Sequence, residues 1–178
     1  MSKCVICFNE HYNQSFDGNP SMYCDTCWPI RDSVRGQNNF VIGSIYLGDM
    51  VSAAKFEGDR LCVHEMVPYY VGQFHHIPIL AKKPKSTTDR TGAVVSMPQL
   101  EAACDLIQKY YVANKPLLVH CHGGIERSPL TLAWWLFTKT SHVYNLDEAY
   151  AYLKLARPAI SPRFFWLPKD SVYYREIP

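Results

Sequence analysis

The stretch LLVHCHGGIERSPLTLAWWLF, residues 117–137, constrains the fold more than any other part of the chain. A short apolar run comes first, mostly polar residues follow, and the last run is apolar nearly all round. The first run predicts a buried strand over 115–121, and the last a central helix over 128–140 that tolerates Pro129 in its first turn. We therefore expect a polar loop that joins a buried strand to a buried helix.

Strand and helix patterns alternate from residue 39 onward. This alternation predicts an α/β domain, a largely parallel sheet flanked by helices. Capping boxes mark the starts of two further helices, with Gln99 three residues after Ser96 and Glu148 three residues after Asn145. The additional strands are expected at 41–48, 60–67 and 74–80, and the additional helices at 96–114 and 145–156.

Residues 1–38 have a different texture, with almost no aliphatic periodicity but four of the seven cysteines. These four form two C-x-x-C pairs whose spacing is typical of structural zinc. Disulfides, unrelated buried thiols or a redox motif are the alternatives, which a reducing compartment and the lack of a packed helix disfavour. We predict a zinc-binding module in 1–38, folded by its metal, and a second domain in 39–178. The predicted ligands are Cys4, Cys7, Cys24 and Cys27.

Composition excludes some classes of function. No apolar run approaches the roughly 18 residues of a membrane span, and the N-terminus lacks an apolar signal core, so we expect a cytoplasmic protein without a membrane partner. A formal net charge of +2 gives no general attraction to nucleic acid, and the basic residues Lys3, Arg31 and Arg35 are sparse. The small module either docks on the larger domain or binds a protein partner, and both possibilities stay open.

The polar loop at 120–129 has the features of an anion site. Backbone N–H groups converge at a helix N-terminus, where the helix dipole favours an anion. Gly123 and Gly124 allow the chain to curl without Cβ clashes, and Arg127 offers a planar fork to phosphate oxygens. The same groups favour the thiolate of Cys121, which is the nucleophilic form. The loop therefore predicts phosphomonoester hydrolysis through a phosphocysteine intermediate.

The spacing H-C-x5-R-S resembles the signature loop of the cysteine-based protein tyrosine phosphatases. IYLGDMVSAAKFE and YLKLARPAISPRFFWL are similar to the opening and C-terminal segments of the dual-specificity phosphatases, so the resemblance spans about residues 40–168. It implies a dual-specificity phosphatase-like fold and a protein tyrosine or dual-specificity phosphatase. Such an enzyme acts on phosphorylated proteins or peptides and needs no cofactor for catalysis.

The resemblance also assigns roles to loop residues. It makes Cys121 the nucleophile, Arg127 the clamp on the phosphate and transition state, and Ser128 the hydroxyl that hydrogen-bonds the sulfur and assists breakdown of the intermediate. His120 orients the loop through ring hydrogen bonds rather than by transferring protons. The expected substrate-binding residues are His122, Gly123, Gly124, Ile125, Glu126 and Arg127.

Two carboxylates, Glu126 and Asp89, also receive predicted roles. Glu126 departs from the family pattern, which often has serine there; because it would repel a dianionic ester, we expect its side chain to point away and make a structural or substrate-selecting contact. The family protonates its leaving group from an aspartate on a loop. Asp89 is the only carboxylate between Glu65 and Glu101, so we predict it as the general acid.

Several alternatives and lesser assignments accompany this interpretation. An RNA 5′ phosphatase that uses the same loop, with the zinc module contacting RNA, is weakened by the near-neutral charge and by the lack of lysine in the loop. A non-catalytic phosphate-binding module is the other alternative, and the presence of Cys121, Arg127 and Ser128 together disfavours it. Cys62 and Cys104 are expected to be inert core thiols, and Arg157 a structural contact.

Overall fold

The computed structural model describes residues 2–4, 6–11 and 22–169. Its main sheet has five strands in the order β3-β4-β9-β5-β6. The pairs β4–β9, β9–β5 and β5–β6 are parallel, and only β3–β4 is antiparallel, which confirms the expected α/β class with a largely parallel sheet. The strands are β3 (Asn39–Ile42), β4 (Ile45–Gly48), β5 (Asp59–Cys62), β6 (His75–His76) and β9 (Leu117–His120).

Three of the predicted strands differ in extent. The segment 41–48 is a hairpin rather than one strand, because Gly43 takes a left-handed φ of 57° and reverses the chain between β3 and β4. The strand expected at 60–67 ends at Cys62. The one expected at 74–80 breaks near Pro78, which has no N–H to donate. Its second part belongs to β7 (Leu80–Lys82), which pairs with β8 (Val94–Val95) in a separate two-stranded sheet.

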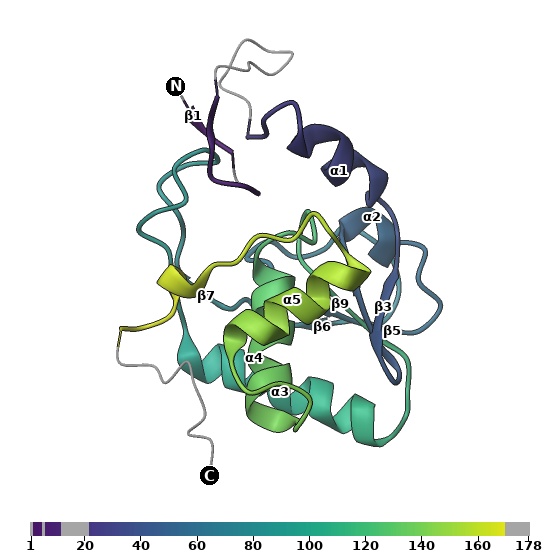
Figure 1. The fold of residues 1–178 in the computed structure, drawn as a ribbon. Helices are drawn as coiled ribbons and strands as arrows, with labels where there is room; N and C mark the ends of the chain where they lie inside the picture. The colour runs from purple at the N-terminus through teal and green to yellow at the C-terminus, as the bar shows by residue number, and fades with distance from the viewer. Residues whose placement is uncertain (1, 5, 12–21, 170–178) are drawn as a thin grey trace.

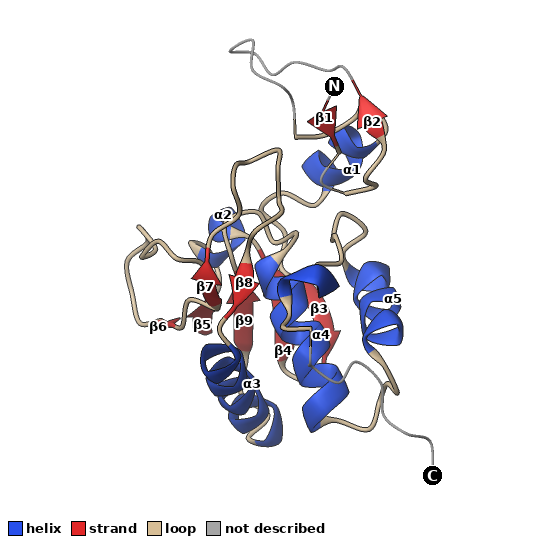
Figure 2. Ribbon diagram, turned by 90° about the vertical axis from the view of Figure 1, so that its left-hand side faces the viewer, coloured by secondary structure: helices blue, strands red, loops and turns tan. Residues whose placement is uncertain are grey.

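Both faces of the central strand β9 are buried, and Figure 2 shows the helices that flank the sheet. Leu117 and Val119 belong to the main core, which packs beneath α3 (Met97–Val112), α4 (Arg127–Lys139) and α5 (Leu146–Ala156). Leu118 points to the other face, in a smaller cluster with α2 (Met50–Ala53). This alternation follows from the two-residue period of a strand. It fixes the end of β9, and therefore the loop that follows, inside the protein.

The three predicted helices lie where the sequence places them, whereas α2 and a further helix at 27–33 in the N-terminal segment were not predicted. The predicted capping interactions are only partly present. The Asn145 side chain accepts a hydrogen bond from the Glu148 N–H at 2.8 Å, but the Glu148 carboxylate accepts from the Tyr144 N–H at 2.8 Å instead of from Asn145, so only half of this capping box is present. Ser96 is the N-cap of α3, yet its side chain makes no capping hydrogen bond, so that capping box is wrong. Its N–H instead donates to the Ile79 carbonyl at 2.8 Å, which ties the start of α3 to the strand segment before it.

The N-terminal residues form a small unit at the carboxyl end of the sheet (Figure 1). It contains the antiparallel pair β1 (Ser2–Lys3) and β2 (Glu10–His11), followed by α1 (Cys27–Ser33). At the other end of the chain, a short 3-10 helix, η1 (Phe164–Trp166), closes the described part. None of the helices in the described ranges is long and apolar enough to cross a membrane.

Candidate active site

Residues 120–129, here the signature loop, connect β9 to α4. Cys121 follows the strand directly and is only 2% exposed. The Ser128 hydroxyl, on the first turn of α4, donates to the Cys121 sulfur at 3.3 Å. The chain thus brings together the expected nucleophile and hydroxyl, seven residues apart, at the N-terminus of a buried helix.

Four consecutive carbonyls of the signature loop are held on one side. Met50 N–H donates to the His122 carbonyl at 3.1 Å, and Ser161 N–H donates to the Ile125 carbonyl at 2.8 Å. Arg157 donates to the two carbonyls between them, at 3.3 Å to Gly123 and 3.0 Å to Gly124. In a trans peptide the next N–H points opposite to the carbonyl. The N–H groups of residues 123–126 therefore face the other side, as an anion-binding loop requires.

Arg157 is the structural contact that the sequence predicts. Its guanidinium is fully buried, pairs with the Asp49 carboxylate at 3.0 Å, and donates to the Val34 carbonyl at 3.0 Å and to the Asn39 side chain at 2.7 Å. Burial lowers the pKa of Arg157, and the Asp49 charge opposes that effect. One side chain thus links the start of α2, the connection before β3 and the signature loop.

Only one of the two glycines is sterically required. Gly124 has φ of 65°, and a Cβ there would lie 2.5 Å from the Gly48 carbonyl oxygen. At Gly123 a Cβ would meet nothing nearer than the Ile125 side chain at 3.6 Å, an ordinary contact. The expectation that both glycines prevent a clash is therefore right for Gly124 and wrong for Gly123.

His120 makes the ring hydrogen bonds expected of it. Nδ1 lies 3.1 Å from the Cys121 carbonyl, which only accepts, so Nδ1 carries the proton. Nε2 then accepts from the Tyr70 hydroxyl, 2.6 Å away. Burial lowers the pKa of His120 to about 4, so the ring is neutral near pH 7. It holds the backbone at Cys121 and exchanges no proton there.

Glu65 lies at the site, although no sequence pattern indicated it. It follows β5, and its carboxylate accepts from Arg127 Nε at 2.8 Å, with both side chains about 10% exposed. Burial raises the pKa of Glu65, but the charge and hydrogen bond of Arg127 together outweigh burial, and the net shift is downward. Glu65 is therefore ionised near pH 7. His64 and His122 lie close by, with ring centroids 5.8 Å apart, and burial followed by the Arg127 charge lowers the pKa of His64 to about 4.

The Glu126 side chain makes a structural contact, as expected. Its carboxylate accepts from Arg163 at 2.6 and 2.8 Å and from Arg90 Nε at 2.8 Å. Glu126 and Arg163 are buried, and the Trp166 indole donates to the Arg90 carbonyl at 2.9 Å. Glu126 therefore connects the signature loop to the 83–93 loop and to the segment around η1.

Asp89 lies on the 83–93 loop, and its carboxylate is bound locally. It accepts from the Thr91 N–H at 3.0 Å and from the Thr91 hydroxyl at 2.6 Å, and it lies 3.8 Å from Lys85 Nζ. The Thr91 hydroxyl holds the pKa of Asp89 below its usual range. None of these contacts joins Asp89 to the signature loop. The neighbouring Arg90 does contact that loop, through Glu126.

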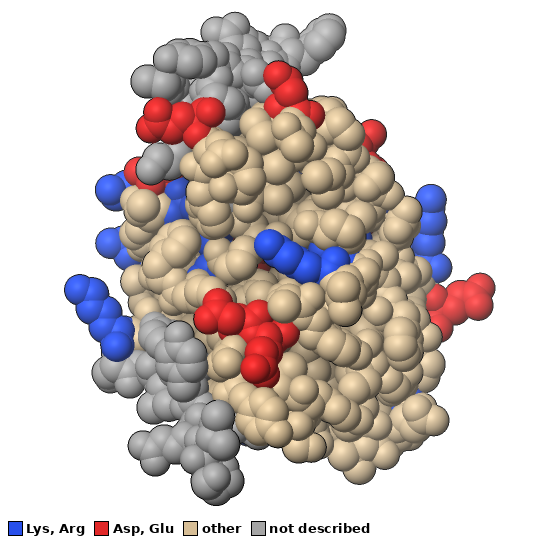
Figure 3. All heavy atoms as spheres, viewed as in Figure 1, with Lys and Arg blue, Asp and Glu red and all other residues tan. Residues whose placement is uncertain are grey.

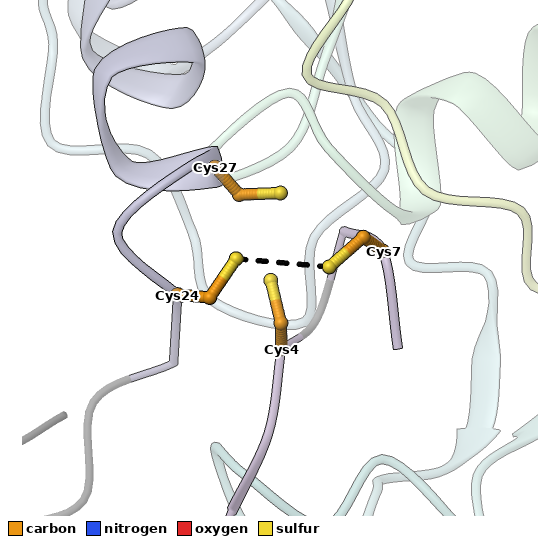
Figure 4. A group of neighbouring side chains, drawn as sticks. All are labelled: Cys4, Cys7, Cys24 and Cys27. Carbon is orange, nitrogen blue, oxygen red and sulfur yellow. Dashed lines mark hydrogen bonds between the residues drawn. The ribbon is translucent and has the colours of Figure 1, made fainter. Parts of the chain in front are cut away.

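The four N-terminal cysteines come together. Their sulfur atoms all lie within 4.8 Å of one another, and Figure 4 shows them pointing to a common centre. Each C-x-x-C pair is a tight turn: Phe8 N–H donates to the Cys4 carbonyl at 2.9 Å and Cys27 N–H to the Cys24 carbonyl at 3.0 Å. All four are free thiols. The chain thus forms a four-sulfur cluster of a kind that metal sites use.

The unit around these cysteines docks on the signature loop. Tyr23 packs on Ile125 in a small apolar cluster, which Ile6 and Met22 extend. Phe8 covers the Arg163 guanidinium, 5.0 Å from the ring centroid, and Arg163 in turn binds Glu126. Of the two roles left open for the module, docking on the larger domain is therefore present.

The two remaining cysteines in apolar contexts are buried, as expected. Cys104 lies in the main core, and burial raises its pKa well above the ordinary value. Burial raises the pKa of Cys62 to about 11. Neither thiol is a nucleophile at neutral pH.

Comparison with known proteins gives consistent matches. The family model "Dual specificity phosphatase, catalytic domain" matches residues 70–168. Human "Dual specificity protein phosphatase 16" is 36% identical over 81 residues, 46% of this chain and 12% of that protein. "Tyrosine-protein phosphatase vhp-1" of Caenorhabditis elegans is 40% identical over 67 residues, 38% of this chain and 10% of that protein. The matched part is thus about a tenth of the length of these curated relatives.

Solved structures share the fold at low sequence identity. The human "tyrosine phosphatase-like serine/threonine/tyrosine-interacting protein" has a TM-score of 0.59 and 18% identity, covering 74% of this chain and 91% of that one. DUSP15 has a TM-score of 0.58 and 19% identity, covering 72% of this chain and 81% of that one. The four-cysteine segment lies outside the residues that the family model matches.

Proposed function

The chain belongs to the family of dual specificity phosphatase catalytic domains, and on this premise we propose that it is a cysteine-dependent protein tyrosine or dual-specificity phosphatase. The observation that carries the proposal is the side to which the signature loop turns its N–H groups. Four carbonyls from His122 to Ile125 are tied outward, and the Cys121 sulfur lies at the base with the Ser128 hydroxyl beside it.

The reaction has two displacements. The Cys121 thiolate attacks the phosphorus of a bound monoester, forming the S–P bond as the P–O bond to the leaving group breaks. The inward N–H groups and the Arg127 guanidinium stabilise the charge on the equatorial oxygens. Water then attacks phosphorus, the S–P bond breaks, and inorganic phosphate leaves. The hydrogen bond from Ser128 stabilises the departing thiolate in this second step.

Asp89 is the proposed donor of the leaving-group proton. Arg90 is anchored on Glu126 of the signature loop, so the 83–93 loop is attached next to the site. To act, Asp89 must exchange its Thr91 hydrogen bonds for the leaving oxygen, and its carboxyl must be protonated at that moment. Asp89→Asn is expected to lower kcat for a phosphotyrosine peptide about 100-fold, and much less for an aryl phosphate whose leaving group needs no proton. An equal loss for both substrates, or none, would assign the acid elsewhere.

The activity is tested with an aryl phosphate in a buffer without added metal or chelator. The protein is expected to release phosphate without added metal, and Cys121→Ser is expected to abolish turnover. Cys62→Ser, at a second buried cysteine, is the matched control and is expected to retain it. A Cys121→Ser protein that keeps wild-type turnover would exclude the covalent mechanism, and inactive wild-type protein that binds phosphate would indicate a non-catalytic module.

Phosphorylated proteins or peptides are the proposed substrates, in preference to RNA 5′ ends. On the face shown in Figure 3, Lys and Arg side chains form small separate groups rather than a continuous basic surface. Proteins that bind single-stranded nucleic acid use a basic groove that follows the backbone. Initial rates on a phosphotyrosine peptide and on triphosphorylated RNA, measured in one assay, distinguish the two substrates.

We also propose that the four-cysteine cluster holds a structural zinc ion. Four thiolates about 2.3 Å from a tetrahedral zinc place their sulfurs about 3.8 Å apart. The Cys7 and Cys24 sulfurs are 3.7 Å apart, which fits one ion in this cluster. Elemental analysis is expected to find one zinc per wild-type chain and none after Cys7→Ser with Cys24→Ser. Wild-type protein that folds without any bound metal would reject the proposal.

A further inference from the structure

The loop between β5 and β6 exposes an uncharged, apolar surface beside the signature loop. Residues 66–74, MVPYYVGQF, contain no charged side chain, in a chain of which 19% is charged. Within this segment Met66, Val67, Tyr69 and Val71 are each between 66% and 95% exposed. We call these four residues the apolar loop surface. Large apolar side chains that gather on a surface, rather than lying singly, mark an interaction site.

Inward-facing residues of the same loop hold it on the protein. Tyr70 is buried in the smaller apolar cluster, on the second face of the sheet, and Phe74 packs against that cluster. The two rings lie edge to face, with centroids 5.4 Å apart, and the Arg60 guanidinium lies 5.2 Å from the Tyr70 ring centroid. Tyr70 is thus turned inward, while Tyr69 and Val71 on either side of it are left in contact with water.

The loop is also tied to residues of the candidate active site. Glu65 directly precedes the apolar loop surface and accepts from Arg127 Nε at 2.8 Å. Because consecutive Cα atoms are about 3.8 Å apart, Met66 begins the surface at the edge of the proposed phosphate site. Tyr70 adds a second tie through its 2.6 Å hydrogen bond to His120. The apolar loop surface therefore keeps a fixed place next to the signature loop.

We propose that the apolar loop surface binds apolar side chains of a phosphorylated protein or peptide, close in sequence to the phosphorylated residue. This inference rests on the proposed function, because the surface is defined by its place beside the phosphate site. An extended peptide advances about 3.3 Å per residue, so side chains roughly one to five positions from the phosphorylated residue come within reach of the surface. Their burial removes apolar area of both partners from water, which favours binding.

The extent and charge of the surface favour a short peptide segment over a second copy of this chain or a membrane. Four side chains offer on the order of a few hundred Å², whereas each partner in a stable protein interface buries about 800 Å². Helices that bind membrane surfaces add Lys or Arg to their apolar residues, and residues 66–74 contain neither. An apolar segment that is already held through its phosphate needs neither a larger area nor basic residues.

The test uses phosphotyrosine peptides in a serine background, with a single leucine moved through the neighbouring positions. Wild-type protein is expected to hydrolyse at least one leucine peptide with a kcat/KM about tenfold above that of the all-serine peptide. Val67→Ser combined with Val71→Ser is expected to remove most of this preference by raising KM for the leucine peptide. Tyr69→Ser is expected to reduce it as a single change. Val112→Ser, at a similarly exposed valine that ends α3, is the matched control and is expected to keep the preference.

Equal rates of wild-type protein on all the peptides, or a folded double variant that keeps the tenfold preference, would overturn the proposal. Two further results would assign the surface to another partner. A wild-type dimer that the double variant no longer forms would indicate a second copy of this chain. Binding to phosphatidylcholine–phosphatidylserine vesicles that the double variant loses would indicate a membrane.

Binding of the same peptides to Cys121→Ser protein separates this proposal from the proposed function. If wild-type protein hydrolyses no peptide, the proposed function fails. Tighter binding of a leucine peptide than of the all-serine peptide, lost when Val67→Ser and Val71→Ser are added, would still support the surface. Equal binding of all the peptides would overturn it.

Discussion

The Arg127 Nε–H donates to the Glu65 carboxylate at 2.8 Å, across a sequence separation of 62 residues. This ion pair fixes the direction of the guanidinium that we propose binds phosphate. Glu65 lies on the loop after β5, and Arg127 is the first residue of α4, which follows β9. Because β5 and β9 are neighbouring parallel strands, they position both partners. An arginine without this support would adopt several rotamers, and part of the binding free energy would be spent on ordering it.

Replacement of Glu65 by alanine is therefore expected to lower kcat/KM for an aryl phosphate about 10- to 100-fold, as loss of a hydrogen bond between charged groups costs about 1.5–3 kcal/mol. Glu65→Gln keeps an acceptor oxygen and is expected to recover part of this loss. Steady-state kinetics together with thermal unfolding separate positioning from folding. Wild-type kcat/KM in a folded Glu65→Ala protein would remove Glu65 from the site.

The two loop glycines are expected to respond differently to alanine. At Gly124 an added methyl group would lie 2.5 Å from the Gly48 carbonyl oxygen in a left-handed backbone, so the loop must shift and turnover is expected to be lost. Gly123→Ala meets only an ordinary contact and is expected to keep turnover within a few-fold. Phosphate affinity and turnover of both variants check this. Equal loss in the two would mean that the loop is not held in the conformation described.

Acid is expected to destabilise the fold through His120. Its pKa is about 4 in the folded protein against 6.5 ordinarily, so below pH 6.5 the unfolded chain binds a proton that the folded chain does not. The free energy of unfolding therefore falls as pH falls from 6.5 to 4, by up to about 1.4 kcal/mol per pH unit from this group. Denaturant unfolding at several pH values measures the slope.

Removing the imidazole with His120→Asn is expected to reduce that slope, whatever it does to overall stability. An unchanged slope in His120→Asn would show that the ring is accessible to protons in the folded state.

Removal of the proposed zinc is expected to lower phosphatase activity, although the ion takes no part in the reaction itself. Under the zinc proposal, the ion on the four-cysteine cluster holds the segment that places Tyr23 on Ile125 and Phe8 on Arg163. Chelation at mildly acidic pH is expected to release zinc and lower kcat/KM several-fold, and added zinc to restore it. Tyr23→Ala is expected to reproduce the loss with zinc still bound. Full activity of the zinc-free protein would mean that the docking has no influence on the loop.

The signature loop can be predicted from the sequence because its functional residues lie close together along the chain. Cys121, Arg127 and Ser128 lie within eight residues, and the apolar runs on both sides predict the strand and helix that present them. The charge of Glu126 alone also predicts that its side chain points away from the phosphate and makes a contact elsewhere. Its partners Arg90 and Arg163 were not, because they come from distant segments with no pattern of their own.

Other features depend on tertiary structure. Glu65 falls in a segment that the sequence predicts to be a strand through residue 67. The strand β5 in fact ends at Cys62, so Glu65 lies on the following loop and contacts Arg127. The docking of the module rests on single apolar residues such as Tyr23, which carry no periodicity. The role of Asp89 stays a prediction. Its loop is long, so the sequence does not indicate where Asp89 lies relative to the signature loop.

Identification of the covalent intermediate tests the role of Cys121 most directly. Ser128→Ala protein, in which breakdown of the intermediate is expected to be slow, is mixed with an aryl phosphate, quenched within milliseconds and digested for mass spectrometry. We predict one phosphoryl group, on the Cys121 sulfur, that disappears in the Cys121→Ser variant. Turnover without any phosphorylated Cys121, or a phosphoryl group on His122 instead, would contradict the central claim.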